Sequence, residues 1–120
     1  MHLKLENLPV SVEAPGTKMC MQQGWGGMAV AYNVMPGVDS RPMLKGLPND
    51  SCPVPHWGYL LKGSMRLIYD NGTEETVSVG DVFYLPAGHN AQSDSEVAWI
   101  EFSPEKELKL VFDHLAKTIK

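Results

Sequence analysis

Glycine and proline recur along the whole chain and leave only short runs of residues between them. The 120 residues include 11 glycines and 9 prolines. Because a helix usually needs about ten uninterrupted residues and a strand only about five, this punctuation favours many short strands joined by turns. The strands that the pattern predicts are 28–35, 56–61, 65–69, 74–79, 82–85 and 97–102.

The tripeptide Asp70-Asn71-Gly72 separates two of these strands. Asn-Gly accepts the positive φ angles that a type I′ turn requires. We therefore expect a tight type I′ hairpin at this point.

The last part of the chain follows a different period. Apolar side chains recur at spacings of three and four over 108–119, which predicts one face of a helix. Ser103 is a natural N-cap, and Pro104 suits the first helical position. Lys117 and Lys120 suit the negative C-terminal end of the helix dipole.

These patterns predict one domain over residues 1–120. A barrel over about 17–102 is followed by the helix over about 104–119. The longest irregular stretch, 38–55, carries four prolines. Loops of that length in a compact domain are often functional.

Charge and hydropathy exclude two classes of partner. The net charge is −4 and no run of Lys or Arg occurs, so nucleic acid is not an expected partner. No stretch approaches the ~18 apolar residues that span a bilayer. The N-terminus lacks the features of a signal peptide, so we expect a cytoplasmic protein whose two cysteines are free.

Two stretches between Cys52 and Pro104 resemble the cupin superfamily. They are HWGYLLKGSMRLIYDNG and GDVFYLPAGHN, and the second fits a motif of Gly, five residues and Pro-x-Gly. The glycines and the proline suit the corners of a closed barrel. The chain resembles in particular small single-domain bacterial cupins that read CPxxHWGY and PAGH. The resemblance implies an all-β fold, the cupin double-stranded β-helix or jelly-roll barrel, here with one C-terminal α-helix.

The usual cupin ligand set is nevertheless absent from these motifs. The first motif normally reads His-x-His, three residues, Glu, six residues, Gly. Counting back from Gly63 places His56 at the Glu position, Cys52 at the second His and Asp50 at the first. In the second motif the His comes directly after the Gly, as His89.

Other metal ligands stand in these places. Asp50, Cys52 and His56 share one parity and would face the same side of a continuous strand, while His89 keeps the inward parity of its own strand. One Cys with two His favours zinc over magnesium or calcium. We therefore expect one divalent metal held by His56, His89 and Cys52, with Asp50 as a further candidate. Iron in the same place stays open, and we assign no catalytic residue.

Each candidate ligand has a plainer alternative that the sequence leaves open. His56 is then a hydrogen-bonded barrel residue, and His89 a loop histidine that closes the barrel mouth. Cys52 is then a small buried hydrophobe or a reactive thiol. Asp50 is then a turn or capping residue.

Four further residues are candidates for a substrate pocket. Gly58 would leave room for a bound molecule, or else mark a bulge. Arg66 would anchor an anionic substrate, or else lie on an exposed strand face. Tyr32 and Tyr84 would line the pocket, or else pack in the core.

The expected function is that of a metal-dependent enzyme acting on a small organic molecule inside the barrel. Isomerisation, elimination, cyclisation and hydrolysis suit zinc, and iron would allow a dioxygenase. The alternative is a cupin that binds or senses a small ligand without catalysis. Because small cupins commonly pair, we also expect a homodimer.

Overall fold

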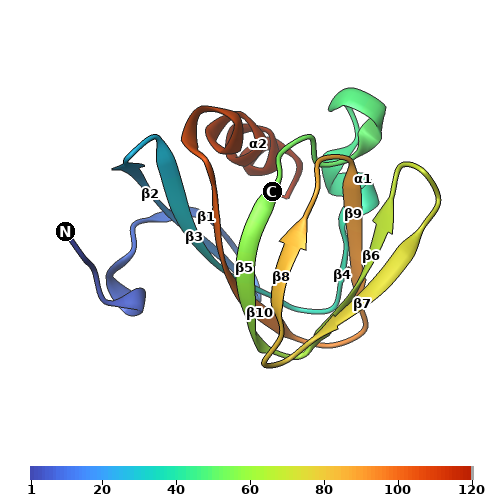
Figure 1. The fold of residues 1–120 in the computed structure, drawn as a ribbon, viewed down its shortest axis with the longest axis horizontal. Coiled ribbons are helices and arrows are strands. Elements are labelled where there is room, and N and C mark those ends of the chain that lie inside the picture. Colours follow the sequence, from blue (N-terminus) through green and yellow to red (C-terminus); the bar gives the residue numbers. More distant parts are fainter. Residues whose placement is uncertain (120) are drawn as a thin grey trace.

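A computed structural model describes residues 1–119, and Lys120, predicted at the end of the helix, lies outside that range. Within it, ten strands form two antiparallel sheets, of order β1-β2-β3-β10-β5-β8 and β4-β9-β6-β7. The strands are β1 Val10–Ala14, β2 Thr17–Trp25, β3 Met28–Met35, β4 Val38–Asp39, β5 His56–Lys62, β6 Ser64–Tyr69, β7 Glu74–Ser78, β8 Val82–Leu85, β9 His89–Ser93 and β10 Val97–Pro104. Figure 1 shows the two sheets as the walls of a barrel.

Two helices cover one end of this barrel. They are α1, Ser40–Leu44, and α2, Glu105–Thr118, and both lie at the upper end in Figure 1. The hydroxyl of Thr118 donates to the carbonyl of Met43 at 2.9 Å, and so ties the end of α2 to α1. No helix within residues 1–119 is long and apolar enough to cross a membrane.

The core is continuous from the barrel to the helical cover. Between the sheets lie Leu60, Leu67 and Val97, all fully buried. The apolar face of α2 packs against β1 and β3 through Leu108 and Phe112. Helix α2 is therefore part of the barrel core, and its 3.6-residue period reflects that single buried face.

All six predicted strands are present. The predictions for β3 and β8 match at both ends, and the others differ by one or two residues. The sequence pattern missed β1, β2, β4 and β9. Strand β9 reads HNAQS and β2 contains Gln-Gln-Gly, so neither shows the apolar alternation by which a strand is recognised.

The hairpin between β6 and β7 is in place, but the predicted type I′ turn is wrong. Gly72 has the positive φ, 88°, whereas that of Asn71 is not positive. The Asn71 side chain instead accepts from the backbone N–H of Thr73 at 2.9 Å. That local bond holds Asn71 in an ordinary turn conformation and leaves the left-handed position to glycine.

The predicted N-cap at Ser103 is also wrong. Strand β10 continues through Pro104, which occupies the N-cap position without a side-chain hydrogen bond. The hydroxyl of Ser103 is fully buried and lies 2.6 Å from Nδ1 of His56. The hydroxyl of Ser103 therefore bonds with His56 inside the barrel and not with the amides of the helix.

Candidate metal centre

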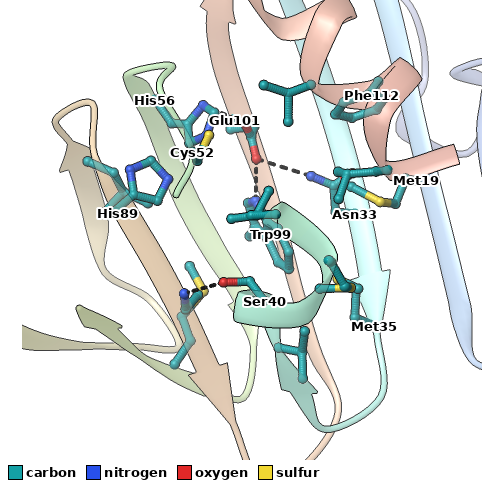
Figure 2. Close-up of a pocket in the computed structure, with 18 of the residues that line it drawn as sticks. Met19, Asn33, Met35, Ser40, Cys52, His56, His89, Trp99, Glu101 and Phe112 are labelled. Carbon is teal, nitrogen blue, oxygen red and sulfur yellow. Dashed lines mark hydrogen bonds and ion pairs between the residues drawn. The ribbon is translucent and has the colours of Figure 1, made fainter. Parts of the chain in front are cut away.

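Three side chains with metal-binding atoms converge inside the barrel. Cys52, His56 and His89 are buried, and their ligand atoms all lie within 4.8 Å of one another. The Sγ of Cys52 is 3.4 Å from Nε2 of His56. Figure 2 shows the three side chains together at one end of the pocket.

The backbone brings these residues together from three segments. His56 and His89 are the first residues of β5 and β9. Cys52 lies in the preceding loop and is paired with β9, because its N–H donates to the carbonyl of His89 at 2.9 Å and its carbonyl accepts from Gly88 at 2.7 Å. The PAGH turn thus fixes the thiol beside both imidazoles.

Each imidazole uses its Nδ1 for a hydrogen bond that points away from the thiol. Nδ1 of His56 lies 2.6 Å from Oε2 of Glu101, and Nδ1 of His89 lies 2.8 Å from the carbonyl of Pro86. Because carboxylate and carbonyl oxygens only accept, Nδ1 carries the proton in both rings. The Nε2 atoms are then the ligand atoms of the two rings, as in metal-binding histidines, and Nε2 of His56 contacts the thiol until a metal displaces its proton.

The charges of this group are coupled. Burial raises the pKa of Cys52, but hydrogen bonds with His56 and His89 and their positive charge outweigh it and bring the pKa to about 6. Burial lowers the pKa of His56, but the charge of Glu101 and the bonds with Cys52 and Glu101 raise it to about 10. Without metal, the pair is therefore a thiolate and an imidazolium near neutral pH.

The carboxylate of Glu101 is the negative charge behind this pair. Burial raises its pKa, but the charge and hydrogen bond of His56 and a bond from Trp99 hold the pKa below its ordinary value. Nε1 of Trp99 donates to Oε1 of Glu101 at 2.5 Å. The buried carboxylate is thus ionised and hydrogen-bonded on both oxygens.

The donor set fits a zinc-type ion. Bond lengths of about 2.3 Å to sulfur and 2.0–2.1 Å to nitrogen place the donors of a tetrahedral site roughly 3.3–3.6 Å apart. The three ligand atoms are at most 4.8 Å apart, so small side-chain rotations bring them to a common centre. Three protein donors leave one position of the tetrahedron for water or a substrate.

Asp50 is not part of this group. The continuous strand that would have aligned it with Cys52 and His56 does not exist, because a 3-10 helix spans Pro48–Asp50 and β5 begins only at His56. Asp50 is exposed, has a positive φ of 53°, and accepts from the N–H of Gly46 at 2.9 Å. The structure thus places Asp50 in a turn, which is the alternative to metal binding that the sequence left open.

Gly58 does not leave space for a bound molecule. A β-carbon there would lie 2.5 Å from Cζ of Phe83 and 2.2 Å from the carbonyl oxygen of Ile100. Phe83 is paired with Gly58 across the β5–β8 ladder. The aromatic ring of this neighbour therefore fills the space that the missing side chain leaves.

The other three pocket candidates also lie elsewhere among residues 1–119. Arg66 is on an exposed strand face, where its guanidinium meets Gln92. Tyr32 packs against a separate small cluster around Cys20. Tyr84 is 54% exposed and stacks on Trp57 with ring centroids 5.2 Å apart.

The actual cavity lies beside the metal-binding group and has a volume of about 90 Å³. Cys52, His56, His89 and Glu101 contribute to one part of its wall. The rest is mainly apolar and comes from both sheets, α1 and α2, with methionines such as Met19, Met35, Met43 and Met65. The cavity suits a small, mainly apolar molecule.

Sequence reasoning missed Glu101, Ser103 and Asn33 as site residues. The signal was present in 97–103, where Val97, Glu101 and Ser103 share the inward parity and are buried. A carboxylate at an inward position of an otherwise apolar strand demands a buried partner. Asn33 lies opposite Trp99 on the paired strand β3, and its side chain reaches Glu101.

Solved structures support the cupin fold, whereas no protein-family profile and no curated protein matches the sequence. An RmlC-like cupin from Shewanella frigidimarina is similar with a TM-score of 0.61 and 17% identity, over 89% of this chain and 93% of that one. The polyketide cyclase RemF from Streptomyces resistomycificus has a TM-score of 0.58 and 18% identity, over 87% and 78%. A structure of Bacillus subtilis oxalate decarboxylase, which has Mn(II) centres, has a TM-score of 0.56 and 22% identity, over 83% of this chain and 28% of that one. The chain has the cupin fold.

Proposed function

We propose that this protein is a metal-dependent enzyme that acts on a small organic molecule inside the barrel. Cys52, His56 and His89 hold one divalent ion, for which zinc is preferred and iron is the second choice. The observation that carries the proposal is the shared orientation of the two imidazoles. Hydrogen bonds at both Nδ1 atoms leave both Nε2 atoms and the Cys52 thiolate as the three donors, once a metal displaces the proton that Nε2 of His56 shares with the thiolate.

The chain's own residues prepare this centre. Glu101 holds the proton at Nδ1 of His56, and the carbonyl of Pro86 holds it at Nδ1 of His89. The lowered pKa of Cys52, about 6, supplies the thiolate that a soft cation requires. A bound divalent ion would polarise a carbonyl or lower the pKa of a water molecule toward ~7.

The cavity supplies the second part of the proposal. Helices α1 and α2 contribute to its mainly apolar wall, and the three candidate ligands are buried. Electrostatic interactions are stronger in such surroundings than in water. The cupin-fold neighbours include a cyclase and a manganese protein, which supports metal-dependent or cyclising chemistry for a site of this kind.

Elemental mass spectrometry of the untagged protein tests the proposal. We expect near-stoichiometric zinc or iron in the wild type and loss of that metal in His56→Ala and His89→Ala. His2→Ala is the matched control, because His2 is exposed and far along the chain from the site. Wild-type protein that neither carries metal nor takes up zinc or ferrous iron would contradict the proposal.

Ligand binding without catalysis is the second candidate, and the mainly apolar wall of the cavity favours it. Turnover and affinity separate the two functions. In an enzyme, Cys52→Ala and His56→Ala abolish turnover of a substrate that still binds. In a binding protein the same variants change only affinity.

A further inference from the structure

The side-chain amide of Asn33 has one hydrogen-bonded atom and one that lacks a partner. Asn33 lies on β3 and is only 1% exposed. Its Nδ2 donates to Oε1 of Glu101 at 3.1 Å, as Figure 2 shows. Its Oδ1 is buried and has no hydrogen-bond partner within residues 1–119.

The orientation of this amide is fixed by its neighbour. Oε1 of Glu101 already accepts from Nε1 of Trp99 at 2.5 Å, an N–H that only donates, so this oxygen is an acceptor. Turning the Asn33 amide around would place Oδ1 against Oε1 of Glu101, with two acceptors facing each other. Nδ2 therefore faces the carboxylate of Glu101, and Oδ1 is the amide atom that does not face it.

The residue that carries this atom belongs to the wall of the cavity. Asn33 lines it together with apolar neighbours that include Met35, two residues along the same strand, and Phe112 of α2. These neighbours offer no hydrogen-bond donor. Buried polar atoms of native proteins are almost always paired, so a partner for Oδ1 is expected.

We propose that Asn33 is a specificity-determining residue, whose Oδ1 accepts a hydrogen bond from an O–H or N–H group of the ligand. The ligand class is a small, mainly apolar molecule with one such donor. Glu101 contacts Asn33 with Oε1 and His56 with Oε2. The same carboxylate thus sets the distance between Oδ1 of Asn33, which would accept from the ligand, and the metal centre. The inference rests on the proposed function in that the same cavity holds the substrate.

Pyrrole and furan are suitable probes for this inference. They are five-membered aromatic rings of nearly equal size, and only pyrrole has an N–H donor. The lone pair of the pyrrole nitrogen is part of the ring, so this probe does not compete as a metal ligand. Dissociation constants come from two-dimensional NMR titration, with zinc-loaded and with chelator-treated protein.

We expect the wild type to bind pyrrole about tenfold more tightly than furan, as one buried hydrogen bond implies. Asn33→Leu should remove this preference, and Val34→Ala, from the same strand but outside the cavity wall, should keep it. Equal binding of the two probes by the wild type overturns the inference and needs no variant that folds. A preference that survives in Asn33→Leu, or one that requires zinc, also overturns it. Absence of metal binding contradicts the proposed function alone, because the preference is measured in chelator-treated protein as well.

Discussion

Oε2 of Glu101 lies 2.6 Å from Nδ1 of His56, and both side chains are buried inside the barrel. The hydroxyl of Ser103 joins them, 2.6 Å from the same Nδ1 and 3.4 Å from the same carboxylate oxygen. A carboxylate behind a ligating imidazole fixes the ring and raises its basicity. Glu101 is therefore a positioning residue for His56.

The substitution Glu101→Gln tests this role. We expect zinc affinity to fall about 10- to 100-fold, because the neutral amide no longer draws the proton to Nδ1. Competition with a coloured chelator measures the change. Glu96→Gln is the control, since Glu96 is an exposed acid that pairs with Lys62. Equal zinc affinity of wild type and Glu101→Gln would show that Glu101 has no influence on metal binding by His56.

Metal removal should lower thermal stability. An ion that binds only the folded chain stabilises it by about 2.7 kcal/mol at 100 times its Kd. For a chain of this length the Tm should rise by about 10 °C. Calorimetry of chelator-treated protein, with and without zinc, measures this shift. In His89→Ala the shift should disappear, and a shift of equal size in that variant would place the ion elsewhere.

The reactivity of Cys52 without metal should depend on pH. Burial raises the pKa of this thiol, but the bonds and charges of both histidines bring it to about 6. The thiolate is present above that pKa and is protonated below it. Alkylation by iodoacetamide should therefore slow as the pH falls through about 6, by up to tenfold per pH unit.

The second thiol is the internal control for this experiment. Burial is the main cause that raises the pKa of Cys20, so Cys20 should react slowly over the same range. Mass spectrometry of labelled peptides separates the two sites. Zinc should protect Cys52 and leave Cys20 unchanged. A constant rate at Cys52 between about pH 5 and 8 would contradict the thiolate.

The fold was predictable because turns and short apolar runs are local signals. The strand 82–85 was found at both ends, since Gly80-Asp81 and Pro86 bound an apolar run. The polar strand β9 was missed, because its place in the sheet depends on pairing with β6, from which it is separated by 20 to 26 residues along the chain. Such pairing leaves no periodic mark in the sequence.

The candidate site was predictable only in part for a related reason. Parity placed His56 and His89 inside the barrel, but parity applies only within one strand. Asp50 is the last residue of a 3-10 helix and is therefore not aligned with His56, whereas Cys52 reaches the site through backbone pairing with His89. Glu101 shows the converse, because its inward position was readable but its partner His56 was 45 residues away along the chain.

Gly58 is required for close packing, which a substitution can measure. A β-carbon there would lie 2.2 Å from the carbonyl oxygen of Ile100, a backbone atom that cannot rotate away. We expect Gly58→Ala to lower the free energy of unfolding by about 3 kcal/mol, as overpacking in a core does. Urea denaturation measures the loss. Gly37→Ala, whose β-carbon would lie 3.0 Å from Asp94, should cost less. An unchanged urea midpoint in Gly58→Ala would show that the pairing of β5 with β10 shifts to accommodate the added β-carbon.

A homodimer remains our proposal for the quaternary structure, and one face of the protein suits it. Strand β8 is an edge of the six-stranded sheet, and Val82 and Tyr84 on it are 81% and 54% exposed. Trp57 and Phe102 extend this apolar face across β5 and β10. Unpaired strand edges and exposed apolar patches are typical of association surfaces.

Light scattering after size exclusion tests this pairing. We expect twice the mass of one chain for the wild type and a single chain for Tyr84→Glu, because a buried carboxylate without a partner opposes association. Leu110→Glu is the control, since Leu110 is 68% exposed on α2, away from this face. It should remain a dimer. A wild-type protein that elutes with the mass of one chain at every concentration would contradict the proposal, and a Leu110→Glu monomer would move the interface to α2.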